Sequence, residues 1–399
     1  MYSPWIILFA GALSAGCVAY VADDADASTV AAEAAQRGGG TFTFAAALAA
    51  AMRQNPELLA LEAQARAAGA VTQPLELQSE YRSDDEMLAV MLDPIALLGL
   101  GARGGAAAVA DAAAAEAVAR LAAGRWQITA AVAETFVLDA ALRSLSVPDL
   151  AADADAFQRA GLASPIAADQ VRAAQARAAA ETLELAKETE ANRAALRNLL
   201  GLPAGTRVEF AASDAELLQQ PEATDAAVLA RPDLALATAR FRVADAEFRA
   251  AVSDQYPSLM LGPEFPLRGG SLEAMAILRV PIGMAGRAEA ARERREAARA
   301  TLGAVWVQAS NAANQAEREL AAAAAGETAS SLSLRASTKD LATARLALQV
   351  EIEAFDRFAK AATMVVRDTM EHRTATQALV RARVQRAVAY GWPLAGSGS

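Results

Sequence analysis

The stretches "QNPELLALEAQARAAGA" at residues 54–70 and "ARPDLALATARFRVADA" at residues 230–246 are similar to each other. In each, a proline stands where a helix would begin, Pro56 or Pro232, and there its missing N–H costs no hydrogen bond. Asn55 is a suitable N-cap for the first helix, because its side chain accepts from free N–H groups. The sequence therefore predicts two equivalent helices within an internal repeat.

The segments after these two helices also correspond. A proline opens an apolar segment in each case, in "QPLEL" and in "YPSLML". We expect one pair of strands over 74–98 and another over 257–283. Each half then continues into a long helical run with one tryptophan, Trp126 or Trp306. The chain is thus predicted to contain two structural repeats, each with a helix, a strand pair and a long helical hairpin, at 41–210 and 211–391.

Alanine dominates the helical runs, and it favours helices while allowing their axes to approach closely. At 1.5 Å per residue, the run from Gly105 to Ser146 would span about 60 Å. The run from Ile166 to Leu200 would span about 50 Å. Breakers such as Pro148 and Pro165 lie between the two runs. The predicted fold class is mainly α with a small β part, built on long antiparallel coiled-coil hairpins.

The predicted strands differ in how closely they follow the apolar–polar alternation of a barrel strand. "LELQSEYR" alternates apolar and polar residues, whereas "EMLAVMLD" does not, and "SLMLGPEF" contains Pro263, which we expect to interrupt it. Each run has about eight residues, against roughly 9–11 for a tilted strand that crosses a bilayer. The pattern predicts hairpins and leaves a full membrane crossing open.

The N-terminus has the layout of a secretion signal over 1–17, with the apolar run "WIILFAGALSAGC" ending at Cys17. Ala15, Gly16 and Cys17 resemble the end of a lipobox, after which the cysteine would be lipidated. A plain signal peptide and a buried thiol are the alternatives. Residues 18–40 are small and acidic and predict a flexible tether, and 392–399 predict a flexible tail.

Charge and hydropathy exclude two classes of protein. The net charge is −10 with both signs mixed along the chain, which argues against a nucleic-acid-binding protein and its basic face. Beyond the N-terminus there is no run of eighteen apolar residues, so we expect no membrane-spanning helix.

Glycines gather in "GLGARGG" at 99–105, where Gly99, Gly101 and Gly104 satisfy the G-x-G-x-x-G pattern of dinucleotide sites. Such a site needs a second strand and an acidic residue about 20 residues further on, but the sequence remains helical there. We therefore interpret these glycines, with Gly286 in the second half, as strand-to-helix hinges.

The sequence contains no catalytic constellation and predicts no enzyme, cofactor or metal site. His372 is the only histidine, and with Asp368 and Glu371 nearby we expect it to be a surface residue on a helix. We find neither a G-x-S-x-G serine nor a phosphate-binding loop.

From about Thr41 to Gly391 the chain resembles the TolC-like outer-membrane efflux proteins, the exit ducts of tripartite pumps. The matching pieces are "FTFAAALAAAMRQNPELLALEAQARAA", "FQRAGLASPIAADQVRAAQARAAAETLELAKETEANRAALRNLLGLP" and "RPDLALATARFRVADAEFRAAVSDQYPSLML". The overall length is nearest to the heavy-metal efflux branch.

The resemblance implies a homotrimer in the outer membrane of a Gram-negative bacterium. Four strands per subunit would close a twelve-stranded β-barrel over an α-helical tunnel, with a small mixed region at 201–230. A periplasmic adaptor and an inner-membrane transporter, of the RND type, would be partners. Small molecules or metal ions would be exported passively. The alternative is a lipid-anchored periplasmic coiled-coil scaffold that lacks a membrane-spanning barrel.

The resemblance also implies an adaptor-docking tip. The matching residues follow Ala160 and are Gly161, Leu162, Ala163 and Ser164. A second tip is expected within "FDRFAKAATMVV" at 355–366, where Lys360, Ala361 and Ala362 replace the usual glycine. Acidic residues near the first tip are candidates for a ring that attracts cations, with outward-facing solvated residues as the alternative: Asp149, Asp153 and Asp155.

Overall fold

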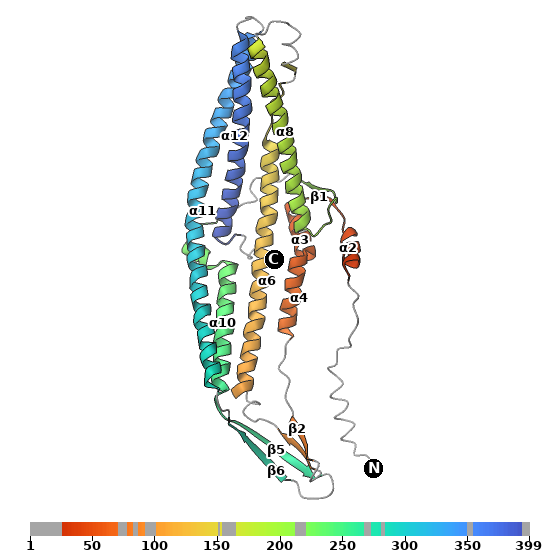
Figure 1. The fold of residues 1–399 in the computed structure, drawn as a ribbon, viewed down its shortest axis with the longest axis vertical. Helices are drawn as coiled ribbons and strands as arrows, with labels where there is room; N and C mark the ends of the chain where they lie inside the picture. The colour runs from red at the N-terminus through yellow and green to blue at the C-terminus, as the bar shows by residue number, and fades with distance from the viewer. Residues whose placement is uncertain are drawn as a thin grey trace.

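The structure is a computed structural model in which long helices lie side by side along one axis, with a small sheet at one end (Figure 1). The prediction of a mainly α protein with a small β part is confirmed. The described residues are 26–70, 78–82, 87–91, 101–150, 152–153, 165–211, 221–266, 273–280, 284–348 and 354–392.

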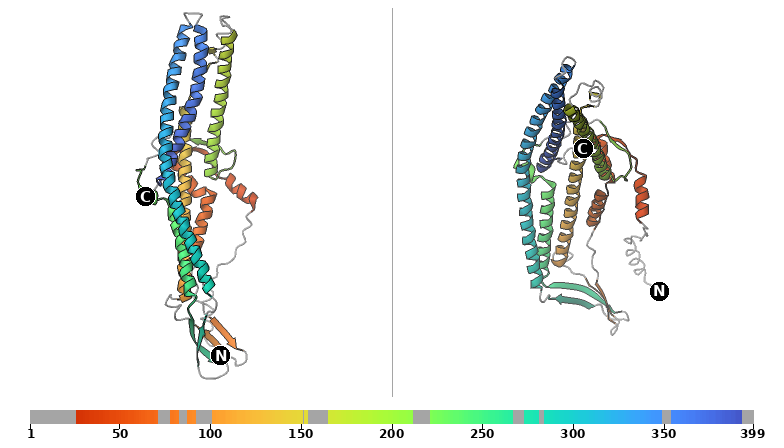
Figure 2. Two further views of the ribbon diagram at one scale, coloured as in Figure 1. Left: turned by 60° about the vertical axis from the view of Figure 1, so that its left-hand side comes forward. Right: turned by 45° about the horizontal axis from the view of Figure 1, so that its top comes forward.

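Four long helices dominate the molecule. Helix α11 (Ala285–Ala347) has 63 residues and spans about 95 Å. Helix α6 (Gly101–Ser144) has 44 residues, and it leaves the same end of the molecule. Helices α8 (Pro165–Leu199) and α12 (Ala354–Ala389) return from the opposite end (Figures 1 and 2).

Shorter helices complete the layer. Helices α3 (Phe44–Gln54) and α4 (Pro56–Gly69) lie beside α6, and α10 (Pro232–Ser253) packs between α6 and α11. Helix α9 (Asp225–Leu229) contacts α11. Within the N-terminal segment, α2 (Ala27–Ala35) is capped by the side chain of Asp26 and has no buried residue.

The two helix starts predicted at Pro56 and Pro232 are confirmed. Asn55 caps α4, with its Oδ1 accepting from the N–H groups of Glu57 at 3.0 Å and Leu58 at 3.2 Å. Pro56 and Pro232 each lie at the start of their helix. Arg231 stands where Asn55 stands in the first helix, but it makes no side-chain cap.

The sheet at one end contains four antiparallel strands in the order β2–β3–β5–β6. The strands are β2 (Gln78–Arg82), β3 (Met87–Met91), β5 (Ser258–Pro266) and β6 (Glu273–Arg279). The expectation that Pro263 interrupts its strand is wrong, because β5 continues through it and pairs it with Ala274. The pairing of β5 with β3 begins only at Glu264, so the proline lies where one side of the strand is unpaired and a missing N–H is tolerated.

A second, two-stranded sheet lies near the middle of the long axis. Strand β1 (Gly40–Phe42) pairs in parallel with β4 (Val208–Phe210), joining segments far apart in the sequence. Gly201 precedes β4 with φ of 62°, and an added Cβ would lie 2.7 Å from the carbonyl oxygen of Gln54. Only glycine fits this turn at the end of α8.

Alanine forms much of the core, as its abundance in the sequence predicts. Of the 50 buried hydrophobic residues in the described part of the chain, 26 are alanine, so the helix axes lie close together. Larger side chains gather at the middle, where Phe136 contacts Phe44 and Phe210 edge to face. None of the described helices combines the length and the apolarity needed to cross a membrane.

The prediction for the second helical tip is wrong. Residues 355–366 lie inside α12, and Phe358, Ala362 and Val366 are fully buried there. This stretch has no proline or glycine, so nothing in it ends a helix, and its apolar face packs against neighbouring helices. Helix α11 ends at Ala347 and α12 begins at Ala354, so the step from one helix to the other precedes residues 355–366.

Candidate functional site

The helical end of the molecule, opposite the sheet, is built on one apolar cluster. The starts of α8 and α12 and the end of α11 meet there around Val171, Leu341 and Phe358, and Leu150 joins them. This packing holds the ends of the segment between α6 and α8. The predicted docking residues Gly161, Leu162, Ala163 and Ser164 belong to that segment and lie outside the described residues.

Arg345 on α11 binds the first part of this segment. The Nε of Arg345 donates to Oδ2 of Asp153 at 3.0 Å, and its Nη2 donates to the backbone oxygen of Asp149 at 3.1 Å. Of the acidic residues proposed for a ring, Asp153 therefore has a cationic partner in its own chain. Asp155 lies outside the described residues.

Buried charges connect α8 to α12. Arg373 on α12 reaches two carboxylates of α8, Glu181 at 2.5 Å and Glu188 at 2.6 Å. Gln377 donates to the other oxygen of Glu188 at 2.6 Å. Glu181 is only 3% exposed, so removing Arg373 would leave an uncompensated charge in the interior.

A second buried carboxylate, Asp368, connects α12 to α11. It accepts from Oγ of Ser333 at 2.9 Å and from Nη2 of Arg367 at 2.9 Å. Burial raises the pKa of Asp368, but the hydrogen bonds from Arg367, Ser333 and Ser337 outweigh burial and hold the pKa below its usual value.

For Asp139 on α6, burial has a larger effect on the pKa than the neighbouring arginines. Burial raises the pKa of this carboxyl above its usual value, against the opposing charges of Arg143 and Arg193. Asp139 forms an ion pair with Arg143, whose Nη2 also donates to the backbone oxygen of Phe210 at 2.9 Å.

His372 is half-buried on α12, and its Nδ1 lies 3.2 Å from Oγ of Ser330 on α11. It therefore bridges two helices, whereas the sequence predicted a surface position. Within the described part of the chain, no three His, Cys, Asp or Glu side chains come together as a metal site.

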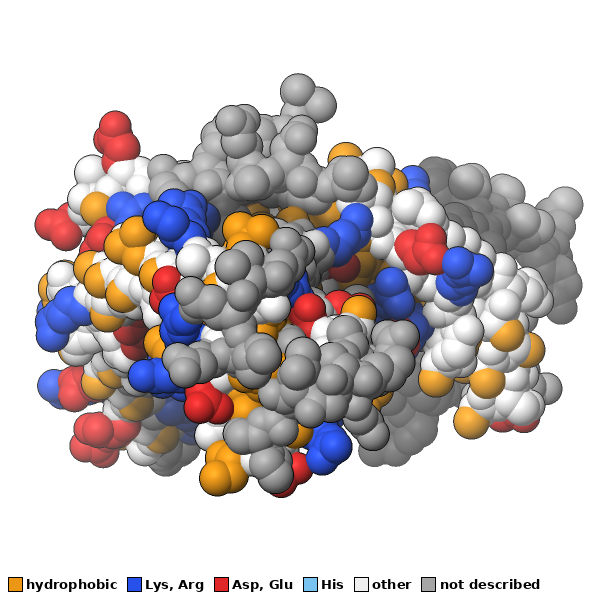
Figure 3. All heavy atoms as spheres, turned by 90° about the horizontal axis from the view of Figure 1, so that it is seen from above, with side chains coloured by type: hydrophobic (Ala, Val, Ile, Leu, Met, Phe, Trp, Pro, Cys, Tyr) orange, Lys and Arg blue, Asp and Glu red, His pale blue; other side chains and the backbone are white. Residues whose placement is uncertain are grey.

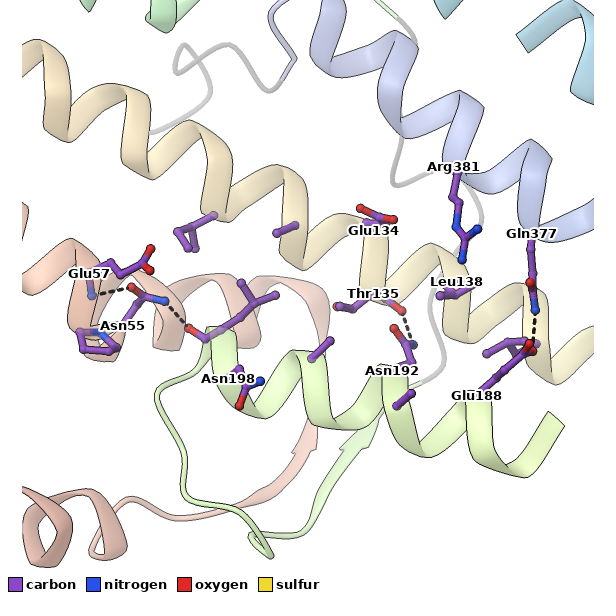
Figure 4. Close-up of a pocket in the computed structure, with 17 residues that line it drawn as sticks. Asn55, Glu57, Glu134, Thr135, Leu138, Glu188, Asn192, Asn198, Gln377 and Arg381 are labelled. Carbon is purple, nitrogen blue, oxygen red and sulfur yellow. Dashed lines mark hydrogen bonds between the residues drawn. The ribbon is translucent and has the colours of Figure 1, made fainter. Parts of the chain in front are cut away.

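A groove of about 640 Å³ runs along the middle of the layer, between the start of α4 and helices α6, α8 and α12 (Figure 4). Two hydrogen bonds join residues that line it. Asn192 donates to the backbone oxygen of Thr135 at 2.8 Å, and Nδ2 of Asn55 donates to that of Leu199 at 3.0 Å. Glu134 and Leu138 on α6 and Arg381 on α12 also line it (Figure 4).

The predicted hinge glycines lie where helices leave the sheet. Gly101 is the first residue of α6, Gly104 lies in its first turn, and Gly286 is the second residue of α11. Gly99 and the proposed lipidation site Cys17 lie outside the described residues. Gly105, next to Gly104, faces another helix closely, because an added Cβ would lie 2.8 Å from Cα of Ala250 on α10.

The surface seen from the helical end carries both signs of charge. Acidic and basic side chains alternate over the described part of this face (Figure 3). This mixture agrees with the charge pattern of the sequence.

Solved structures of outer-membrane channels share this arrangement. CusC superimposes with a TM-score of 0.70 over 89% of this chain and 95% of its own, at 14% identity. The Neisseria gonorrhoeae channel MtrE, in its open state, gives 0.69 over 88% and 89%, at 15% identity. The Campylobacter jejuni channel CmeC gives 0.66 over 95% and 94%, at 12% identity.

The chain has an outer-membrane channel fold. This confirms the fold expected from the resemblance to TolC-like proteins, because the similarity covers nearly the whole length of each chain. No protein-family model and no curated protein matches the sequence itself.

Two features of this channel fold escaped the analysis of the sequence. Arg373 and Glu181 are 192 residues apart, so no local pattern signals their contact. Gly105 belongs to the quoted glycine run, but the close approach involves Ala250 on another helix. Small residues such as these permit a close helix contact, but alanine and glycine occur throughout the helices of this sequence. They therefore do not show which two helices meet.

Proposed function

We propose that this chain is a subunit of the outer-membrane exit duct of a tripartite efflux system. It would export small molecules or metal ions passively, without enzymatic activity. The observation that carries the proposal is the shared architecture: a layer of long helices joined at one end to a four-stranded sheet, as in channels that match over most of their length.

Three copies would complete the duct. The sheet of one copy ends in β2 on one side and β6 on the other. Unpaired strand edges invite pairing with another chain, and three such sheets give twelve strands in a closed barrel. The order of helix, strand pair and long helices is the same before and after the middle of the chain, which supports the duplicated unit at 41–210 and 211–391.

The remaining assignments follow from the same proposal. A periplasmic adaptor would dock at Gly161–Ser164, and an inner-membrane transporter of the RND type would supply the work. Cys17 would carry the lipid anchor after the signal over 1–17, with 18–40 as a tether. The glycines at the sheet end would let the chain turn from barrel to tunnel.

The first test is the mass of the purified full-length protein in detergent, measured by light scattering that subtracts the detergent, together with negative-stain images. We expect a particle of three subunits shaped as a long tube. A single subunit without a tube would contradict the duct, and the helices would then belong to a scaffold.

A further inference from the structure

A cavity of about 430 Å³ lies where the helices meet the four-stranded sheet, between α6, α10 and α11. The end of α10 and the first turns of α11 form most of its wall, and both helices reach the sheet there (Figure 1). Val109 on α6 lies on a third side. Small residues of α10 and α11 leave the space between them open: Ala250, Ala251, Gly286, Ala290 and Ala291.

Charged side chains of both signs line this cavity. Glu247 and Asp254 belong to the α10 side, and Arg287 and Arg294 belong to α11. In each pair the two residues are seven positions apart, which places them on one face of the helix, about 10 Å apart along its axis. Because α10 runs toward the sheet and α11 runs away from it, Glu247 is in register with Arg294, and Asp254 with Arg287.

The two pairs of charges differ in whether they are joined. Farther from the sheet, Nη1 of Arg294 lies 3.5 Å from Oε2 of Glu247. Nearer the sheet, neither Asp254 nor Arg287 has an ion-pair partner within the described part of the chain, although both line the same cavity. An acidic and a basic group therefore stand apart with open space between them.

Both of these charges occupy the helix end that disfavours them. Asp254 is the C-cap of α10, where the backbone carbonyl groups carry a partial negative charge. Arg287 lies in the first turn of α11, where the backbone N–H groups carry a partial positive charge. A bound molecule with a cationic group at Asp254 and an anionic group at Arg287 offsets both repulsions. The geometry thus favours a zwitterionic ligand.

Apolar and aromatic side chains are exposed on the sheet side of the cavity. Tyr256, two residues after Asp254, is 70% exposed. Leu278 on β6 is 63% exposed, and Val280, directly after this strand, is 59% exposed. Exposed apolar side chains beside a tyrosine and arginines are typical of a surface that passes from lipid hydrocarbon to headgroups. A phospholipid satisfies both the charges and this apolar surface.

We propose that this cavity binds the headgroup of a zwitterionic phospholipid with a primary ammonium, as in phosphatidylethanolamine. Arg287 binds the phosphate through the forked N–H donors of its guanidinium, and Asp254 accepts hydrogen bonds from the ammonium. The acyl chains lie toward Leu278 and Val280. The inference rests on the proposed duct, because the sheet must lie in a membrane for the cavity to meet its headgroups.

The test measures lipid adducts of the full-length protein in detergent by native mass spectrometry. The probes are equal amounts of dioleoyl phosphatidylethanolamine, phosphatidylcholine and phosphatidylglycerol. We expect the phosphatidylethanolamine adduct to exceed each of the others severalfold. Phosphatidylcholine has the same charges, but its quaternary ammonium has no N–H to donate to Asp254. Phosphatidylglycerol has the phosphate without a cation.

Substitutions separate the two halves of the headgroup. Asp254→Asn should reduce the phosphatidylethanolamine adduct to the level of phosphatidylcholine, without lowering the phosphatidylglycerol adduct. Arg287→Gln should lower all three adducts, because the phosphate is common to them. Two exposed residues outside the cavity provide matched controls, and Arg299→Gln on α11 and Asp356→Asn on α12 should keep the preference of the wild type.

Three outcomes would overturn the inference. They are equal adducts of the three lipids on the wild type, a preference that survives Asp254→Asn, and an equally abundant adduct of phosphoethanolamine without acyl chains, which would assign the cavity to a soluble ligand. Light scattering on the same samples separates this failure from that of the duct. A trimer without lipid preference removes the lipid site alone, whereas a monomer without preference removes both.

Discussion

At the scale of single residues, two glycines in long helices have opposite surroundings. Gly105 on α6 faces α10 so closely that a Cβ would lie 2.8 Å from Cα of Ala250, whereas a Cβ added at Gly303 on α11 would have open space around it. Alanine at Gly303 should raise the free energy of unfolding by about 0.5–1 kcal/mol, because glycine is the more costly residue to order in a helix.

Gly105→Ala should lower the free energy of unfolding by about 1–3 kcal/mol, because α6 and α10 must move apart to make room for the Cβ. Denaturant unfolding of both variants beside the wild type checks the pair. A gain in stability from Gly105→Ala would show that α6 and α10 are further apart than described here.

The buried carboxylate of Asp368 predicts a pH dependence. Hydrogen bonds lower its pKa in the folded state, so its stabilisation is present above the unfolded pKa of about 4 and is lost as the pH falls through the folded pKa. Asp368→Asn should therefore cost about 1–3 kcal/mol at pH 7, and the difference from wild type should narrow below about pH 4.

Unfolding midpoints measured from pH 7 down to pH 3 check this expectation. Asp356→Asn is the matched control, since Asp356 lies on the same helix but is exposed. A deficit of Asp368→Asn that stays constant down to pH 3 would mean that the carboxylate charge is not what stabilises the site.

At the scale of helices and strands, the sequence predicted best where its signals are local. Pro56 and Pro232 mark helix starts because proline there needs no partner for its backbone nitrogen, and both helices begin as expected. Pro165, expected as a breaker before a run from Ile166, is the first residue of α8. Between the end of α11 at Ala347 and the start of α12 at Ala354 the sequence has no proline or glycine, and the prediction therefore misplaced the step between these helices.

The docking tip yields a prediction at the same scale. Gly161→Val should impair export without preventing trimer formation, because a β-branched residue resists the tight turn that would present Leu162 to the adaptor. Export in cells and mass in detergent should be measured together. Gly326→Val, an exposed glycine within α11, is the control and should export normally.

Normal export by Gly161→Val would remove the docking proposal. Loss of the trimer would instead assign this glycine a role in folding.

At the scale of the whole molecule, the architecture was predictable because it depends on order and length along the chain. Alanine-rich runs gave the long helices, and paired apolar segments between prolines gave the strands. The contacts that align the layer were not predictable. Arg373 with Glu181 and Arg345 with Asp153 each join residues 192 positions apart, and such partners are set only once the helices have packed.

The proposed duct predicts that ions pass through the purified protein in a bilayer. If three sheets close into a barrel that continues the helical tunnel, the purified trimer should give discrete conductance steps in planar bilayers, because water and ions would fill the lumen. Steps should come only from fractions that have the trimer mass. Tubes that persist in negative stain but never conduct would favour the lipid-anchored scaffold, with the short strands forming a cap instead of a wall.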